Sequence, residues 1–233
     1  MLLLFLSAAP LCAFEHAGDA AVSSGVPHIP EPMVFDLVRP LGVRRGEFET
    51  NALFQYVPES GEVDWAPEIE YGVFDGFAVE IELPFTGSAL QEYKVAAQGT
   101  LASADGFVHG WQVIARRVRH DAEYSVDGLY LAGYSWPGPA SMLSMVGMRT
   151  EGIGGALRHL AIVNSAWFVD LSAALTLGLE VNLELADRSN YLAMPQIHGD
   201  LSEQVTIQFG GGRTGDADRT AAWQLAGRFI VAF

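Results

Sequence analysis

The alternation of apolar and polar residues along this chain restricts its fold more than any other feature of the sequence. In the stretch PEIEYGVFDGFAVEIELPF, residues 67–85, glutamates alternate with isoleucine, valine and tyrosine around an Asp-Gly pair. A period of two is typical of β-strands, and Asp-Gly between two such runs predicts a hairpin with a two-residue turn. Two folds accommodate this hairpin. A soluble sandwich would bury its apolar face, whereas a membrane barrel would turn that face to lipid and the glutamates to the lumen.

The same alternation recurs in about twelve segments that are separated by turn residues. Most are long enough to cross a bilayer at a tilt, which takes about 9–11 residues. Pro67 and Pro195 fall within two of these segments, where the missing ladder hydrogen bond predicts a β-bulge. The segments expected as strands are residues 46–57, 62–74, 77–85, 91–102, 106–117, 122–134, 141–150, 156–169, 174–186, 190–199, 203–212 and 219–233.

The residues before the first expected strand divide into two parts. Residues 1–13, in MLLLFLSAAPLCAFEH, are typical of a signal peptide that is cleaved near Ala13. Residues 14–45 predict an arm that stays in the periplasm or enters the lumen, and residues 46–233 would form the barrel. The one cysteine, Cys12, lies in the signal peptide, so the mature chain is expected to have no disulfide. No second segment is apolar enough to predict a transmembrane helix.

Composition excludes one class of partner and leaves no signal for catalysis. The chain has a net charge of −15, and such an acidic chain is not expected to bind nucleic acid, because phosphate contacts need a basic surface. HExxH, CxxC and GxSxG motifs are absent, and the six histidines lack metal-ligand spacing. We therefore predict no enzymatic activity, cofactor or metal, with an outer-membrane barrel enzyme as the alternative. The glycine-rich stretch GGGRTG predicts an outer loop rather than a phosphate site.

The last segment decides between the two folds. AAWQLAGRFIVAF alternates throughout and ends on an aromatic residue, so Phe229, Val231 and Phe233 would form an assembly signal read by the barrel-assembly machinery. A soluble protein that happens to end in phenylalanine is the alternative. Together with the signal peptide and the strand series, this ending predicts an all-β, transmembrane, antiparallel up-and-down β-barrel of about twelve strands. Its expected location is the outer membrane of a Gram-negative bacterium, in contact with outer-membrane lipids and lipopolysaccharide.

The barrel interpretation places the charged residues in the lumen. A charge that faces lipid near the midplane costs up to about 2–4 kcal/mol, so the alternating glutamates must point inward. One hypothesis is an acidic wall that attracts cations, and the alternative is a solvated or salt-bridged interior. Counter-charges are expected from Lys94, Arg116 and Arg228, with Arg149 and Arg158 as further candidates. The residues predicted to line the lumen are Glu47, Glu49, Glu68, Glu70, Glu80, Glu82, Arg116, Glu180, Glu184 and Arg228.

From about Met33 to Phe233, the chain resembles outer-membrane barrels of the phenol-degradation meta-pathway family, which are regarded as transporters. The residues that carry the resemblance are the hairpin PEIEYGVFDGFAVEIELPF, the stretch LSAALTLGLEVNLEL and the closing RFIVAF. The resemblance implies an outer-membrane barrel and a transport role. The expected function is therefore passive passage of small molecules through a narrow acidic lumen. The alternative is a closed barrel, plugged by the arm, that serves a structural or partner-docking role.

Overall fold

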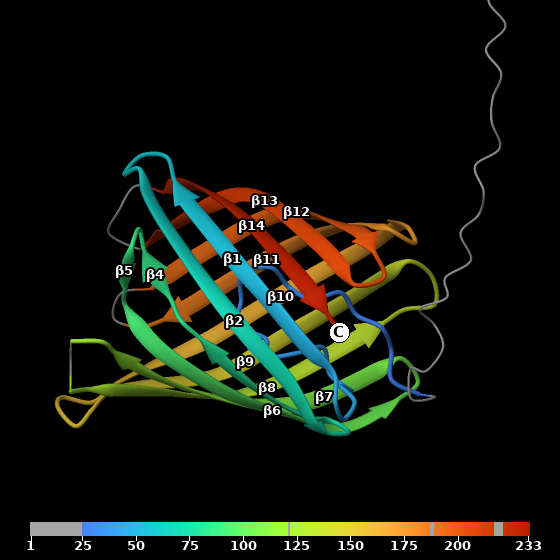
Figure 1. The fold of residues 1–233 in the computed structure, drawn as a ribbon, viewed down its shortest axis with the longest axis horizontal. Coiled ribbons are helices and arrows are strands. Elements are labelled where there is room, and N and C mark those ends of the chain that lie inside the picture. The colour runs from blue at the N-terminus through green and yellow to red at the C-terminus, as the bar shows by residue number, and fades with distance from the viewer. Residues whose placement is uncertain (1–24, 121, 187–188, 217–220) are drawn as a thin grey trace, which may run out of the picture.

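The computed structural model describes residues 25–120, 122–186, 189–216 and 221–233 (Figure 1). The predicted signal peptide, residues 1–13, and the first part of the predicted arm lie outside these ranges. Within them, the chain forms strands, turns and irregular segments, and no helix is long and apolar enough to cross a membrane.

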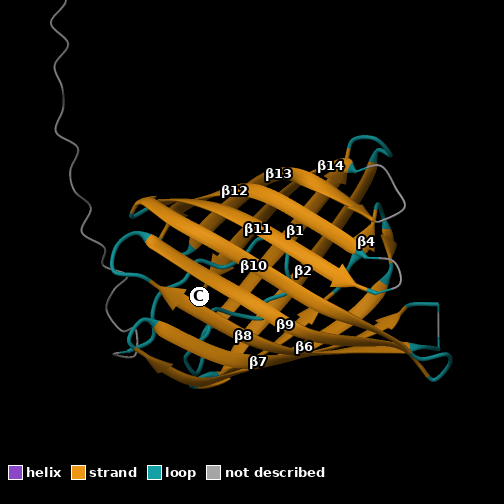
Figure 2. Ribbon diagram, turned by 180° about the vertical axis from the view of Figure 1, so that it is seen from behind, coloured by secondary structure: helices purple, strands orange, loops and turns teal. Residues whose placement is uncertain are grey.

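Twelve of the fourteen strands form one closed antiparallel barrel, which confirms the predicted fold class. Strand β1 (Phe48–Val57) pairs with both β2 (Glu62–Phe74) and β14 (Ala222–Ala232), so the sheet has no free edge along its length. Figures 1 and 2 show the strands wrapping around the barrel at a steep tilt. The other barrel strands are β3 (Phe77–Glu82), β6 (Glu92–Ala104), β7 (Phe107–Val118), β8 (Tyr124–Ser135), β9 (Ala140–Ile153), β10 (Arg158–Ser172), β11 (Leu175–Leu185), β12 (Asn190–Ser202) and β13 (Val205–Asp216).

The connection between β3 and β6 differs from the prediction. The expected strand 77–85 ends at Glu82, shortly before Pro84, which has no N–H to donate to a ladder. The chain then forms a small hairpin of β4 (Phe85–Thr86) and β5 (Ala89–Leu90), and β4 pairs with the beginning of β2.

The bulges predicted at the two prolines do not form. Pro67 stands opposite Ala52 in an uninterrupted β1–β2 register. Pro195 stands opposite Leu179 on β11, and the β12–β13 register is the same on both sides of it. The register shifts lie near strand ends instead, for example between Asp170 and Ser172. A proline can therefore be placed where the ladder loses one bond without an inserted residue.

The two ends of the barrel differ in their connections. At one end, the turn end, Asp105 and Gly106 have φ angles of 51° and 80°, the left-handed pair that a tight two-residue hairpin requires. Phe233 donates its N–H to the carbonyl of Phe48 over 2.8 Å at this same end. The other end, the loop end, carries the connections around residues 58–61, 83–91 and 154–157. The arm that precedes β1 therefore meets the barrel at its turn end.

The alternation of the sequence separates the two faces of the barrel wall. On β3, Ile81 is 60% exposed, whereas the neighbouring Glu80 and Glu82 are 3% and 7% exposed. Aromatic side chains stack on the outer face near the barrel ends, as Phe74 and Phe77 do at a centroid distance of 4.7 Å. Apolar side chains thus cover the outside, and the charged side chains of these strands point into the lumen.

Candidate functional site

The lumen is occupied by the part of the arm that the structure describes, residues 25–45. The hydroxyl of Ser103 donates to the carbonyl of Gly25 at the turn end. Gly46 returns to that end, where its N–H donates to the carbonyl of Gly72. Between these points the arm runs into the barrel and back (Figure 1). Val34, Phe35 and Asp36 line the same cavity as Asn190 and Thr214, which lie toward the loop end. The arm is therefore a loop inserted from the turn end.

Glu180, on β11, is the main anchor of this inserted loop. Its carboxylate accepts the backbone N–H groups of Met33, Val34 and Phe35 at 3.0, 3.1 and 2.7 Å. The side chain is fully buried, and Asn182 donates a further bond of 2.7 Å to it. Several N–H···O hydrogen bonds to one carboxylate offset the desolvation cost of the carboxylate and of the N–H groups that donate to it.

Glutamine side chains of the wall supply further backbone contacts of the arm. Gln112 accepts the N–H of Val38 at 3.2 Å and donates to the carbonyl of Asp36 at 2.7 Å. Gln208 donates to the carbonyl of Glu31 at 3.1 Å. The sequence did not predict a role for the side-chain amides of these two glutamines. The arm has no regular secondary structure there, so the wall must satisfy its backbone groups.

A first ion cluster joins the arm to β1, β2 and β14. Arg228 Nη2 lies 2.6 Å from Glu68 and 2.7 Å from Glu31 of the arm. Arg39 of the arm contacts Glu49 directly and lies 3.8 Å from Glu70. Two guanidinium groups therefore face four buried carboxyl groups at the junction of the arm and the wall.

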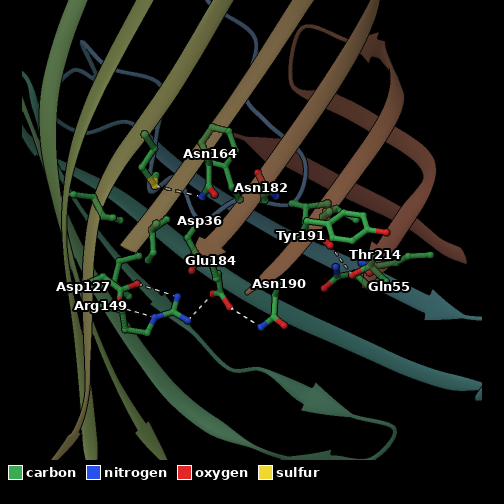
Figure 3. Close-up of a pocket in the computed structure, with 18 residues that line it drawn as sticks. Asp36, Gln55, Asp127, Arg149, Asn164, Asn182, Glu184, Asn190, Tyr191 and Thr214 are labelled. Carbon is green, nitrogen blue, oxygen red and sulfur yellow. Dashed lines mark hydrogen bonds and ion pairs between the residues drawn. The ribbon is translucent and has the colours of Figure 1, made fainter. Parts of the chain in front are cut away.

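A second ion cluster surrounds Asp36, near the apex of the arm. Lys94 Nζ lies 2.6 Å from Asp36, and Arg116 Nη2 lies 2.5 Å from it. Arg116 continues to Asp127 at 2.7 Å. Arg149 bridges Asp127 at 2.9 Å and Glu184 at 2.8 Å (Figure 3). A chain of ion pairs thus runs along the inner wall, from Lys94 on β6 to Glu184 on β11.

The arm residues differ in how the lumen affects their ionisation. Burial raises the pKa of Glu31 to about 8, and the nearby Glu49 and Glu68 act in the same direction, against the opposing Arg228. Burial would also raise the pKa of Asp36, but Lys94 and Arg116 outweigh it and hold that pKa below its usual range. Near neutral pH, the arm therefore carries an ionised carboxylate at its apex and a protonated one near its base.

The structure places most of the predicted lumen residues on the inner wall, within these clusters. Glu80 and Glu82 both contact Lys94. Glu47 differs from the others because it precedes β1, is only half-buried and lies 3.6 Å from Arg39. Arg158 points to solvent at the rim, where it pairs with Glu151 at 3.3 Å. The inward residues from the predicted set are Glu49, Glu68, Glu70, Glu80, Glu82, Arg116, Glu180, Glu184 and Arg228.

The apolar half of the lumen was missed by the sequence analysis. Side chains of β7 to β10, among them Ile114, Leu131 and Met145, pack against Phe35 and Val38 of the arm. Apolar residues at both parities, as in SMLSMVGM on β9, were the signal for this surface. Such a strand can be expected to be covered on both faces.

Two inward glycines let the arm approach the wall closely. A Cβ atom on Gly133 would overlap the side chain of Ile29, and one on Gly210 would overlap the end of Met33. A side chain at either position would have to displace the end of the Ile29 or Met33 side chain. The inner wall is shaped to the arm as well as bonded to it.

Two larger cavities lie beside the arm, one toward each end of the barrel. The loop-side vestibule has a volume of about 250 Å³, and Val34, Phe35 and Asp36 form part of its lining (Figure 3). The turn-side vestibule has a volume of about 220 Å³ and is lined in part by Glu31 and His198. A cavity of only about 30 Å³ lies beside Met33 to Leu37. The arm therefore divides the lumen into two compartments.

Two groups of carboxylates are close enough to share a cation. They are Glu31 with Glu49 and Glu70, and Glu68 with Glu80 and Glu82. Arginine side chains already neutralise the first group, and Lys94 neutralises much of the second. A metal would have to displace these side chains, so neither group favours a metal site.

We expect Arg228→Met to destabilise the folded barrel. The substitution leaves three carboxyl groups, those of Glu31, Glu68 and Glu70, without their nearest cation, and breaking a buried pair costs about 3–5 kcal/mol. The measurement is urea unfolding of the detergent-folded chain. Arg158→Met is the matched control, because an exposed pair contributes only about 0–1 kcal/mol. Equal unfolding midpoints for the two variants would contradict this account of the cluster.

Comparison with solved structures identifies barrels of the same shape. An outer-membrane channel from Pseudomonas putida F1 superimposes with a TM-score of 0.65 at 11% identity, over 85% of this chain and 100% of that chain. The chain shares its fold with outer-membrane β-barrels. The NanC porin superimposes with a TM-score of 0.60 at 8% identity, over 79% of this chain and 98% of its own. The KdgM porin in complex with disordered oligogalacturonate gives a TM-score of 0.59 at 9% identity, over 80% and 98%.

Sequence comparisons give no family for the chain. No family model matches it, and no curated protein matches it. The resemblance to the phenol-degradation meta-pathway barrels therefore stays a prediction, whereas the likeness to outer-membrane barrels is shown at the level of the fold.

Proposed function

We propose that the protein is an outer-membrane channel for small molecules, in which the inserted arm controls passage between the two vestibules. The observation that carries the proposal is the combination of an apolar outer face with a polar, partly hollow lumen. The outward side chains of the strands are largely apolar, as contact with lipid requires. A charge on that face would cost about 2–4 kcal/mol near the midplane. A soluble protein would have to leave this large apolar surface in water.

The lumen favours cations and uncharged molecules over anions. Glu92 lies 3.9 Å from Arg116 at the edge of the second cluster. With Glu92 and Glu180, the clusters described above bring twelve carboxyl groups and five cationic side chains into or next to the lumen. If every carboxyl group is ionised, seven negative charges are in excess. Charge of one sign along a narrow path raises the local concentration of counter-ions. The ligand named for the KdgM complex, an acidic oligosaccharide, is therefore not the expected substrate here.

The test is the current through single barrels in a planar bilayer under a KCl gradient. We expect discrete conductance steps with a reversal potential that favours K⁺ over Cl⁻. Silent barrels that are folded and heat-modifiable would instead support the alternative of a permanently closed structural barrel. That alternative also has an observation in its favour, since the arm fills the middle of the lumen with well-bonded backbone.

We further propose that the closing strand carries the assembly signal. Phe229 and Phe233 are exposed on the outer face, at 47% and 68%, where assembly machinery and then lipid can reach them. We expect Phe233→Ala to lower the amount of heat-modifiable barrel in the outer membrane, measured in cell envelopes against total protein. Trp223→Ala, on the same face at the opposite end of β14, is the control. Equal loss in both variants would argue against a signal at the carboxy terminus.

A further inference from the structure

We propose that the loop-side vestibule is a binding site for a small uncharged molecule with several hydroxyl groups and one apolar face, as a monosaccharide has. The proposal rests on the channel function and names the kind of molecule that the channel takes. The vestibule has one polar side, one apolar side and a charged floor, and each of these restricts the ligand.

The polar side is lined by carboxamides. Gln55, Asn164, Asn182, Asn190 and Gln224 all face the cavity. The side chains of Gln55 and Gln224 make no hydrogen bond to any residue that the structure describes, and Asn164 reaches only the sulfur of Met145 at 3.9 Å. The buried Oδ1 atom of Asn182 also has no hydrogen-bond partner among the described residues.

Carboxamides offer a donor and an acceptor on one planar group. Several of them around one cavity suit a ligand whose own groups both donate and accept, which is the property of hydroxyl groups. An unbonded buried amide oxygen is costly, and a hydroxyl donor would relieve that cost. The amides therefore point to a ligand with several hydroxyl groups rather than to a purely apolar one.

A second part of the lining is apolar. Ile114, Leu129, Met145 and Ile162 come from four successive strands, and Phe35 of the arm adds an aromatic ring. Burial of ligand C–H groups against such a surface contributes about 25 cal/mol per Å². Hydroxyl groups placed against this apolar lining would lose their hydrogen bonds to water without replacing them, so the ligand should carry an apolar face.

The charges exclude anions. Asp36, Asp127 and Glu184 line the vestibule together with Arg149, the one cation among the lining residues that the structure describes. Arg149 is already shared by Asp127 and Glu184, so this side chain is not free to receive a carboxylate. The carboxylate of an acidic sugar would be repelled by the carboxylates of the vestibule and would find no cation to pair with. A neutral sugar with the same ring avoids this repulsion.

The experiment compares three probes by saturation-transfer NMR on the detergent-folded full chain, which does not depend on conduction. D-glucose tests the proposal, D-glucuronate adds only a carboxylate, and phenol offers an apolar face with a single hydroxyl. We expect glucose to bind with a Kd on the order of millimolar, typical of a small ligand, and to bind at least about tenfold more tightly than glucuronate.

Variants locate the site. Asn182→Leu and Gln224→Leu should each weaken glucose binding by about tenfold, because each removes an amide that would bond a hydroxyl group. Gln196→Leu is the matched control, since this buried amide also faces inward from β12 but lines neither vestibule. Heat modifiability confirms that each variant is folded before it is compared.

The outcomes separate this proposal from the channel function. Glucose binding that both vestibule variants lose supports the site, even if the barrel is electrically silent. Absence of glucose binding, equal binding of glucuronate, or binding of phenol alone overturns it, even if the barrel conducts K⁺. Loss of binding in Gln196→Leu would also overturn it, because the effect would not belong to the vestibule.

Discussion

Removal of residues 14–45 should convert a nearly closed barrel into an open, cation-selective pore. A twelve-stranded barrel lies between eight-stranded barrels, which side chains fill, and sixteen-stranded porins, so its emptied lumen should admit water and raise the conductance by roughly tenfold or more. Deletion removes two carboxyl groups of the clusters, Glu31 and Asp36, together with one cation, Arg39. The wall keeps its excess of carboxyl groups over cations, so the open pore should still prefer K⁺ over Cl⁻.

The truncated barrel retains the strand ladders that hold the wall together, but it exposes the apolar inner half to water. A second variant therefore keeps the arm and removes its anchor. Glu180→Leu leaves three buried N–H groups without their acceptor, at a cost of about 1–3 kcal/mol each, which should favour the undocked arm. Glu151→Leu, on the rim of β9, is the control. Conductance that is unchanged in both the deletion and Glu180→Leu would rule out the arm as the barrier.

Strand positions and side-chain partners differ in how far the sequence predicts them. The positions of most strands could be predicted, because a period of two and an apolar outer surface leave one register for a hairpin such as that of residues 67–82. The direction of Glu68 or Glu80 followed from parity alone. The partners of these residues did not, since Arg39, Asp36 and Glu31 come from an irregular arm without any periodic signal. The predicted acidic wall is consequently a set of ion pairs between wall and arm, with an excess of carboxyl groups.

The vestibules could not be predicted for a related reason. Their shape depends on where the arm turns back inside the barrel, and this depends on contacts such as those between Glu180 and Phe35 across 145 residues of sequence. The apolar half of the lumen was readable in principle from strand β9, whose residues are apolar at both parities. A barrel strand whose residues are apolar on both faces requires another segment of the protein to cover its lumenal face.

Raising the pH from about 5 to 8 should loosen the arm from the wall, through the carboxyl group of Glu31. This group is almost completely buried and faces Glu49 on β1, Glu68 and Glu70 on β2, and Arg228 on β14. Arg39 of the arm is the second cation of the cluster. Two cations cannot compensate four ionised carboxylates in so dry a site, and therefore the docked arm retains a proton on Glu31.

The direction of the pH effect on docking follows from the difference in the pKa of Glu31 between the docked and undocked arm. In the docked arm, the pKa of Glu31 is raised to about 8 from an ordinary value of 4.5, chiefly because of burial. The docked state binds the proton more tightly, so docking is strongest below pH 4.5 and weakens as the pH rises toward 8. Each pH unit in this window lowers the docking constant by up to about tenfold, or about 1.4 kcal/mol, and the effect levels off above pH 8.

The measurement is the rate at which a thiol on the arm reacts with a maleimide. Val38 is fully buried, and Cys12 lies in the predicted signal peptide, so Val38→Cys supplies the reactive thiol of the mature chain. Labelling should rise more steeply with pH in this variant than in the same variant carrying Glu31→Gln, which keeps the side chain neutral. The ratio of the two rates removes the intrinsic reactivity of the thiol.

Glu203→Gln, in an exposed turn, should leave the steep pH dependence intact. A ratio that stays constant between pH 5 and 8 would show that the proton on Glu31 does not hold the arm, and that the ion pairs of Asp36 are its main electrostatic attachment.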